Sequence, residues 1–496
     1  MDAYDSRDPK SIEAYAKRLK GKTFYDVLNM GIYPEGKSKI DYEGKKLNKG
    51  KLGNLLEERY FGYEVNSISA ADFPEAGVEL KTTCYDITKS GRASAGERLV
   101  LGMLSFDEPI EDDFFKSHVW TKCKSMLLIE YERVKGSKDK LSQRIEYACL
   151  FTPSDADLRI IADDYRVISA KVKSGKAHEL SESDTVYLSA ATKGASEATM
   201  WVLQKQYAPK VPAKKRAFSF KRSYMDYILH EYIFPDADIS SSSSDYGQKI
   251  IADSRDLEGK SFDELLIEKI NGFVGMTDEE LCLRFKKELK GSKSRWSELV
   301  FCMLGVSSNG AEELQKANMV VKSIKVEEAG GVKESVSFPA FEFADLLKED
   351  WDDSALLDYL EETRFLFIIW RKVGSLCVLE GAKVWNMPYK DLEEVRKCWE
   401  KTREIVFDGV NITPQKVSKG VRYLNNLPGE RDNAVAHVRP HASKRAYRFE
   451  DGSIVGDIEN DASELPDGRM MTKQCFWLNS NYVYESIVFP FLDKKE

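Results

Sequence analysis

The sequence has no pair of cysteines spaced as C-x-x-C, although eight cysteines occur in its 496 residues. Structural zinc sites and disulfide frameworks need closely spaced cysteines, so this scatter disfavours both. We therefore expect the cysteines to be reduced residues of the core. They stand singly in apolar segments, at positions 84, 123, 149, 282, 302, 377, 398 and 475.

Long apolar runs are also absent, and no segment approaches the roughly 18 residues that a membrane-spanning helix needs. The first residues, Met1 to Lys20, are charged and lack the apolar stretch of a secretory signal. We expect a cytoplasmic protein. A hydrophobic content of 42% with 31% charged residues is typical of globular chains, and the length predicts two large domains.

Acidic residues are missing from two stretches, although the net charge of the chain is −8. A basic stretch taken alone is as consistent with a solvated face as with a nucleic-acid contact, but a nuclease needs positive charge only where phosphates lie. The stretches are 199–225, which contains Lys215, Arg216 and Lys221 among aromatic residues, and 433–449, which contains Arg439 and His441.

The second half of the chain repeats the first in faint but collinear matches. A glycine-lysine-hydroxyl-phenylalanine string at 21–24 returns at 259–262, and the apolar strand 126–129 returns at 365–368. Near the end of each half, Arg216 to Lys221 corresponds to Gln474 to Asn479. An order that never breaks indicates a duplication.

A serine-rich segment separates the two halves, with the composition of a flexible linker. We predict a first domain at 1–238, a linker at 239–258 and a second domain at 259–496. Each half contains an opening helical region, several apolar strands, a helix and further short strands. This order predicts an α/β fold (α+β) in which a mixed β-sheet is flanked by helices.

The candidate chemistry of the first half lies in the segment Asp72 to Thr82. Glu79 and Lys81 alternate with apolar residues, so in a strand both side chains emerge on one face, about 7 Å apart. A proline-glycine turn can fold Asp72 back beside Glu79, and Glu57 on an upstream helix is a third carboxylate. Such a group suits Mg²⁺, and a lysine beside it can orient water and stabilise charge on a phosphate. By spacing alone, an amphipathic edge strand with a salt bridge is the more common explanation of so short a pattern.

With its upstream G-x-x-G-x-L-L-E and the later Glu97-Arg98-Leu99-Val100-Leu101, this segment resembles the MutH family, which includes GATC-nicking repair enzymes and Sau-type GATC restriction endonucleases. The resemblance implies a restriction-endonuclease-like fold in two tandem domains, magnesium-dependent cleavage of double-stranded DNA, recognition of GATC, and a catalytic set of Glu57, Asp72, Glu79 and Lys81. It makes Lys193, and more weakly Glu97, base readers, although Ser219 stands where the nicking enzyme has tyrosine. Lysine can bond guanine, and glutamate can accept from cytosine.

The second half has lost this set. Aligning the repeats places Val300 at the position of Glu57, Val320 at that of Glu79 and Glu313 near that of Asp72, whereas Lys322 survives at that of Lys81. Because valine cannot ligate Mg²⁺, we expect this half not to cut. Its basic residues predict DNA binding as an effector module, through Arg439, His441 and Trp477.

Two other functions stay open at this point. A repair nickase would cut one strand under the control of a partner protein, and a non-catalytic regulator would only bind DNA. A metal site at His437 and His441 is also conceivable, but no cysteine or further histidine lies near them in the sequence. Because a palindromic target suits two catalytic domains related by a two-fold axis, we expect a dimer on DNA.

Overall fold

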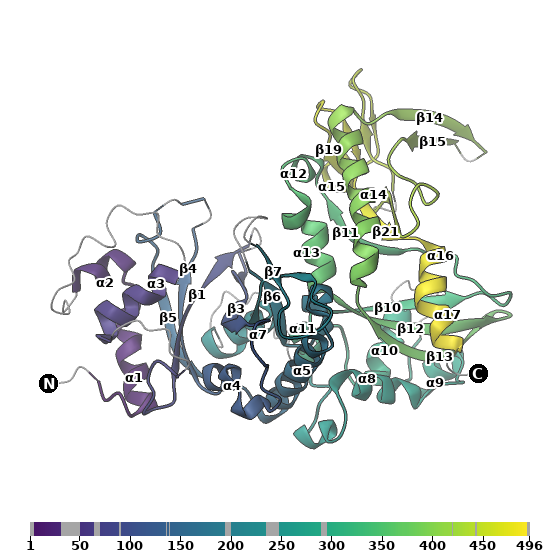
Figure 1. Cartoon of the computed structure of the whole chain (residues 1–496). Coiled ribbons are helices and arrows are strands. Elements are labelled where there is room, and N and C mark those ends of the chain that lie inside the picture. The colour runs from purple at the N-terminus through teal and green to yellow at the C-terminus, as the bar shows by residue number, and fades with distance from the viewer. Residues whose placement is uncertain are drawn as a thin grey trace. The chain divides into compact units, whose positions relative to one another are not determined.

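The computed structural model describes residues 4–30, 50–63, 70–88, 91–134, 136–137, 139–193, 200–234, 248–288, 295–418, 420–441 and 444–493. The chain divides into two compact units (Figure 1). Unit 1 consists of Met1–Leu265 and Asn309–Met319, and unit 2 of Leu266–Ser308 and Val320–Glu496. In the described part of the chain, no helix is long and apolar enough to cross a membrane.

Unit 1 contains two sheets. The larger has the order β2-β1-β4-β5, and only its central pair, β1 and β4, is parallel. The smaller has the order β3-β9-β6 and is antiparallel. The strands are β1 (Glu79–Ile87), β2 (Ala93–Ala95), β3 (Leu99–Leu104), β4 (Met126–Glu132), β5 (Ile145–Phe151), β6 (Leu188–Thr192) and β9 (Arg216–Phe220), with a separate hairpin of β7 (Trp201–Leu203) and β8 (Pro212–Lys214).

The helices of unit 1 follow from local signals. In the longest, α5 (Asp155–Lys173), the Ser154 side chain accepts from the Asp157 N–H, acidic residues occupy the first turn and lysines the last. All three features stabilise a helix. The other helices are α1 (Pro9–Ala16), α2 (Phe24–Met30), α3 (Gly50–Leu55), which continues as a π-helical turn (Leu56–Phe61), α4 (His118–Cys123), α7 (Arg222–Ile228) and α11 (Glu312–Lys316).

Helix α11 belongs to unit 1, although it comes from the second half of the sequence. Its Lys316 is 1% exposed, and its ammonium contacts Asp157 at 2.8 Å and Glu312 at 2.7 Å. The same ammonium lies 3.9 Å from the ring centre of Tyr227. Glu313, also buried, accepts the N–H groups of Ile250 and Ile251. A second-half segment therefore supplies the counter-charge of a buried carboxylate in unit 1.

Unit 2 repeats the two sheets as β10-β12-β13 and β11-β21-β16. The strands are β10 (Met319–Val326), β11 (Val336–Phe341), β12 (Arg364–Val373), β13 (Leu376–Trp385), β16 (Ala436–Pro440) and β21 (Gln474–Leu478). The main helices are α9 (Asp278–Arg284), α10 (Arg295–Leu304), α12 (Phe343–Leu346), α13 (Ala355–Glu362), α14 (Tyr389–Asp408), α15 (Ile458–Asp461), α16 (Ser480–Tyr482) and α17 (Phe489–Asp493), and α8 (Phe262–Asn271) crosses the division between the units.

Unit 2 also contains strands that pair outside these two sheets. One group is an antiparallel hairpin of β14 (Ile412–Val417) and β15 (Gly420–Asn425), visible as a separate ribbon in Figure 1. The other is a four-stranded sheet of β17 (Tyr447–Arg448), β18 (Ile454–Val455), β19 (Ala462–Glu464) and β20 (Met470–Thr472).

Equivalent hydrogen bonds confirm the duplication. The Lys193 N–H donates to the Lys215 carbonyl at 2.8 Å, and the His441 N–H donates to the Lys473 carbonyl at 2.9 Å. A β-bulge follows Glu130 in β4, and another follows Ile369, its counterpart in β12. Repeated bulges are positional features of a fold, so the two halves share one α/β plan.

The domain division drawn from the sequence stays a prediction. Part of the proposed linker, 239–247, lies outside the described residues. Its remainder, 248–258, includes buried Ile250 and Ile251 and belongs to unit 1.

Candidate active site

Asp72 lies beside the start of β1 because the chain between them forms a tight turn. Phe73 and Val78 exchange two backbone hydrogen bonds, of 2.9 and 3.2 Å. Gly77 has a φ of +66°, which glycine adopts at little steric cost. The Leu80 N–H then donates to Asp72 Oδ2 at 2.9 Å, which fixes this carboxylate against the strand.

Glu79 is held between two ammonium groups. It is 2% exposed, and Lys81 Nζ lies 2.7 Å from its Oε1, as expected for side chains on one face of a strand. Lys122, near the end of α4, lies 2.9 Å from Oε2 and also donates to the Ala70 carbonyl at 2.7 Å. Because the ammonium groups occupy different oxygens, the carboxylate is fixed in orientation.

The remaining carboxylates are close enough to disturb one another. Burial and, to a smaller extent, the charge of Asp72 raise the pKa of Glu57 to about 7, against the opposing effect of Lys81. Burial and the charge of Glu79 raise the pKa of Asp72 to about 6, although the hydrogen bond from Leu80 opposes the shift. Partly buried negative charges in this state favour a nearby cation.

The donor set fits a hard divalent cation, since Mg²⁺ prefers carboxylates, waters and phosphate oxygens. Tyr63 adds an observation of its own. Its hydroxyl is buried without a hydrogen-bond partner, and its pKa is raised by burial and by the charges of Asp72 and Glu57. Within the described residues, no three His, Cys, Asp or Glu side chains are gathered as a ready-made metal cluster. A cation here would be held by Asp72 and Glu79 with Glu57 nearby, and by substrate oxygens.

Lys122 and Tyr63 were missed by sequence reasoning. Lys122 reaches Glu79 because β4, which follows α4, pairs in parallel with β1 and places Met126 opposite Glu79. A lysine four residues before an apolar strand could have been found only by predicting that pairing. Tyr63 carries no spacing signal at all.

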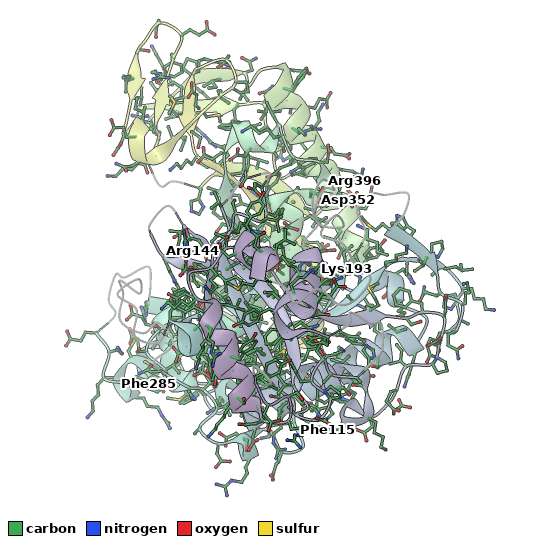
Figure 2. The ribbon with its side chains drawn as sticks, turned by 90° about the vertical axis from the view of Figure 1, so that its left-hand side faces the viewer. Phe115, Arg144, Lys193, Phe285, Asp352 and Arg396 are labelled. Atoms are coloured by element: carbon green, nitrogen blue, oxygen red, sulfur yellow. The ribbon has the colours of Figure 1, made fainter. Side chains whose placement is uncertain are left out.

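The predicted base readers of unit 1 lie at the smaller sheet and beside the middle of β1. Lys193, labelled in Figure 2, directly follows β6 and is half-buried, and burial together with the charge of Arg98 lowers its pKa. Lys215 lies in the adjoining strand connection, where its carbonyl accepts from Lys193. Glu97 accepts a hydrogen bond from the Thr83 hydroxyl at 3.4 Å. Thr83 comes two residues after Lys81 in β1 and so lies on the same face of the strand. Their contacts with DNA stay predictions.

Two predicted DNA contacts, Arg216 and Lys221, are instead buried and bound to the main chain. Arg216 is 2% exposed and its guanidinium donates to the carbonyls of Ala190 and Leu180. Lys221 is 3% exposed and its ammonium donates to the Thr185 carbonyl at 2.5 Å. Because these side chains are buried and donate to carbonyl groups inside unit 1, their positions argue against contacts with DNA phosphates.

The corresponding place in unit 2 is apolar. Val300 is fully buried in α10, and Val320 follows the first residue of β10. Asn318, with a φ of +48°, stands at the turn position of Gly77, which supports the alignment. Lys322 survives, and burial lowers its pKa. Glu313, assigned near the Asp72 position, is instead used to bind the backbone of Ile250 and Ile251.

The predicted DNA-contact residues of unit 2 lie together on β16, β21 and the residue that follows β16. The guanidinium of exposed Arg439 lies 4.6 Å from the ring centre of Trp477, whose indole N–H donates to the Arg439 carbonyl. His441 is exposed at the end of β16, and its Nδ1 lies 3.4 Å from Cys475 Sγ. His437 is buried and bonded to Asn479, so the two histidines do not form a shared exposed site.

Comparison with known proteins supports the assignment made from this geometry. The family model of the DNA mismatch repair enzyme MutH matches residues 61–164, which include Asp72, Glu79, Lys81 and Lys122. The type II restriction enzyme Sau3AI of Staphylococcus aureus is 32% identical over 490 residues, covering 93% of this chain and 97% of that enzyme. The chain therefore belongs to the MutH-like family of type II restriction endonucleases, which hydrolyse DNA at specific sites.

Proposed function

We propose that unit 1 cuts both strands of DNA at GATC in a magnesium-dependent reaction, and that unit 2 binds a second DNA site as an effector. The observation that carries the catalytic part is Glu79, a buried carboxylate held between Lys81 and Lys122 beside Asp72. The other carboxylate of the predicted set, Glu57, is electrostatically coupled to Asp72.

The reaction is the attack of a water oxygen on phosphorus, with cleavage of the bond to one sugar oxygen. A bound Mg²⁺ would supply Lewis acidity and lower the pKa of a coordinated water. Lys81 is placed to orient the attacking water and to offset charge on the phosphate oxygens, because its ammonium already lies on Glu79. Lys122 fixes the other Glu79 oxygen and so positions the carboxylate rather than the substrate.

The GATC target comes from the resemblance to the MutH family, and Lys193 at the end of β6 is the candidate reader of guanine. Glu97 is a weaker candidate for cytosine. Because the target is palindromic, we propose that two chains assemble on it with their first units related by a two-fold axis.

The effector role of unit 2 is supported by two features. Its valines at the positions of Glu57 and Glu79 cannot bind a metal ion, and exposed Arg439 forms a cationic-aromatic pair with half-buried Trp477 beside His441. Occupation of two DNA sites by one chain would raise the effective concentration of the second site.

The test is digestion of unmethylated phage DNA of known sequence by the purified full-length chain in Mg²⁺, followed by sequencing of the fragment ends. We expect double-strand ends at every GATC without an accessory protein. The Asp72→Ala variant should leave the DNA intact, as should addition of EDTA. Single-strand nicks alone would indicate a repair nickase instead, and DNA binding without any cleavage would indicate a non-catalytic regulator.

A further inference from the structure

The β14–β15 hairpin of unit 2 has no equivalent at the same place of unit 1, residues 174–187, all of which the structure describes. In unit 1, 14 residues connect the end of α5 at Lys173 with the start of β6 at Leu188. In unit 2, 27 residues connect the end of α14 at Asp408 with the start of β16 at Ala436. The extra chain forms this ribbon, about 20 Å long at 3.3 Å per residue. Unit 2 therefore has an element at this place that unit 1 does not have.

The two faces of the ribbon differ. One face packs on unit 2, with Ile412 half-buried and the Tyr423 ring 4.7 Å from that of Tyr447. On the other face, Gln415 and Arg422 are exposed and directly opposite each other in the strand register. Because the opposite face of the ribbon packs on unit 2, the face that carries Gln415 and Arg422 is held in a defined orientation.

A basic groove runs beside β15, with a volume of about 460 Å³. Its lining includes Arg422, Arg439, Lys444 and Arg445 and no acidic residue. Among the described residues, none of these four cations makes an ion pair within 4 Å of a carboxylate. The charge of Arg439 helps to lower the pKa of Glu430, and that of Lys444 helps to lower the pKa of Asp457, but neither carboxylate lines the groove.

The ribbon sequence agrees with this charge. No acidic residue occurs from Gly409 to Gly429, and Lys416 on β14 is exposed. The Arg445 guanidinium, which lines the groove, donates to the carbonyl of Val421 in β15. This hydrogen bond connects the groove to the ribbon. Ribbon and groove therefore form one continuous cationic surface, which includes the previously predicted Arg439.

We propose that this surface, the β14–β15 ribbon with its basic groove, binds duplex DNA, with Gln415 and Arg422 at base edges and Lys444 and Arg439 at phosphates. A two-stranded ribbon fits the major groove, where arginine can bond guanine and glutamine can bond adenine in bidentate fashion. The paired side chains thus suit adjacent guanine and adenine. The inference rests on the proposed role of unit 2 as the binder of a second DNA site, and it locates that site.

The experiment uses the full-length chain in Ca²⁺, titrated with a fluorescent 30-base-pair duplex that contains one GATC, or with the same duplex scrambled. The variants Arg422→Ala, Gln415→Ala and Lys444→Ala are compared with Arg396→Ala and Lys397→Ala on α14, which remove a half-buried and an exposed cation outside this surface. Circular dichroism and thermal melting check that each variant folds.

We expect wild type to bind two duplexes per chain. Lys444→Ala should weaken the second event about three- to tenfold for both sequences and lower the slope of log affinity against log salt by about 1. Arg422→Ala should weaken GATC binding about 5- to 100-fold and scrambled binding less. The α14 variants should match wild type.

Three outcomes would overturn the inference: equal second-duplex binding by the ribbon and α14 variants, saturation at one duplex per chain in wild type, or preferential displacement of DNA by RNA. The proposed cleavage function is scored separately, by digestion in Mg²⁺. A chain that fails to cut GATC but loses salt-dependent binding to the scrambled duplex when Lys444 is replaced would refute that function and keep the DNA-binding surface.

Discussion

Units 1 and 2 share a scaffold but differ at the place where chemistry occurs. In unit 1, Tyr224 donates to Asp157, and in unit 2, Tyr482 donates to Asp391, at the same point of the repeat. By contrast, the buried carboxylate Glu79 is replaced by Val320. Bonds that fix helices to sheets are present in both units, whereas the buried carboxylate proposed to act in catalysis is present only in unit 1. Burying a charge costs desolvation free energy even when the charge is paired, so we infer that such a group is retained only where a function needs it.

The largest expected effect follows from making unit 1 resemble unit 2. Glu79→Val should lower the cleavage rate at least 10³-fold, about 4 kcal/mol of transition-state stabilisation, because it removes a proposed metal ligand and leaves Lys81 and Lys122 without their shared partner. Single-turnover cleavage in Mg²⁺ measures the loss. A rate within tenfold of wild type would contradict the assigned role of this carboxylate.

The two equivalent lysines provide a matched pair. Lys81→Ala should reduce single-turnover cleavage about 10²- to 10³-fold, since it removes the ammonium beside the reacting phosphate. Lys322→Ala, the same change in unit 2, should leave the rate within twofold. Comparable losses in both variants would mean that unit 2 takes part in the chemistry.

Glu130 gives a prediction for stability. Burial raises its pKa from 4.5 to about 8, and its counterpart in unit 2 is Ile369. Because Glu130 binds its proton more tightly in the folded than in the unfolded state, protonation of Glu130 stabilises the fold. This contribution to the free energy of unfolding is complete below pH 4.5 and is lost as pH rises through 8. Glu130→Gln should therefore reduce the loss of unfolding free energy between pH 6 and 8 by roughly 1–3 kcal/mol. Urea unfolding at both pH values tests this, and an unchanged pH dependence would contradict it.

The smallest effect is expected at Lys221. Its counterpart in unit 2, Asn479, donates to the Asn433 carbonyl as Lys221 donates to that of Thr185. Lys221→Asn should cost about 1 kcal/mol of unfolding free energy or less and leave the salt dependence of DNA binding unchanged. A lower salt slope would show that the ammonium does reach phosphate, against its buried position.

Local patterns in the sequence predicted much of the site. Alternation placed Glu79 and Lys81 on one strand face, and the proline-glycine turn returned Asp72 to that strand. The repeat predicted two halves of one plan, which the equivalent sheets confirm. These inferences succeeded because each depends on neighbours only a few residues apart or on an ordered match between halves.

Longer-range features could not be predicted in this way. Lys122 reaches Glu79 through the parallel pairing of β1 and β4, which no spacing in the sequence reveals. Arg216 was assigned to a DNA surface because it lies in an acid-free stretch, yet every residue of β9 is buried. Charge along a sequence does not tell which cations face solvent and which bind carbonyl groups.

The position of α11 constrains how this gene can be divided. A fragment that ends at residue 258 would retain Asp157, Ile250 and Ile251 but lose Lys316 and Glu313, which bind them. Expressing the two halves as separate chains would therefore leave buried polar groups of unit 1 without their partners. The second half contributes to the folding of the first whatever its own chemistry.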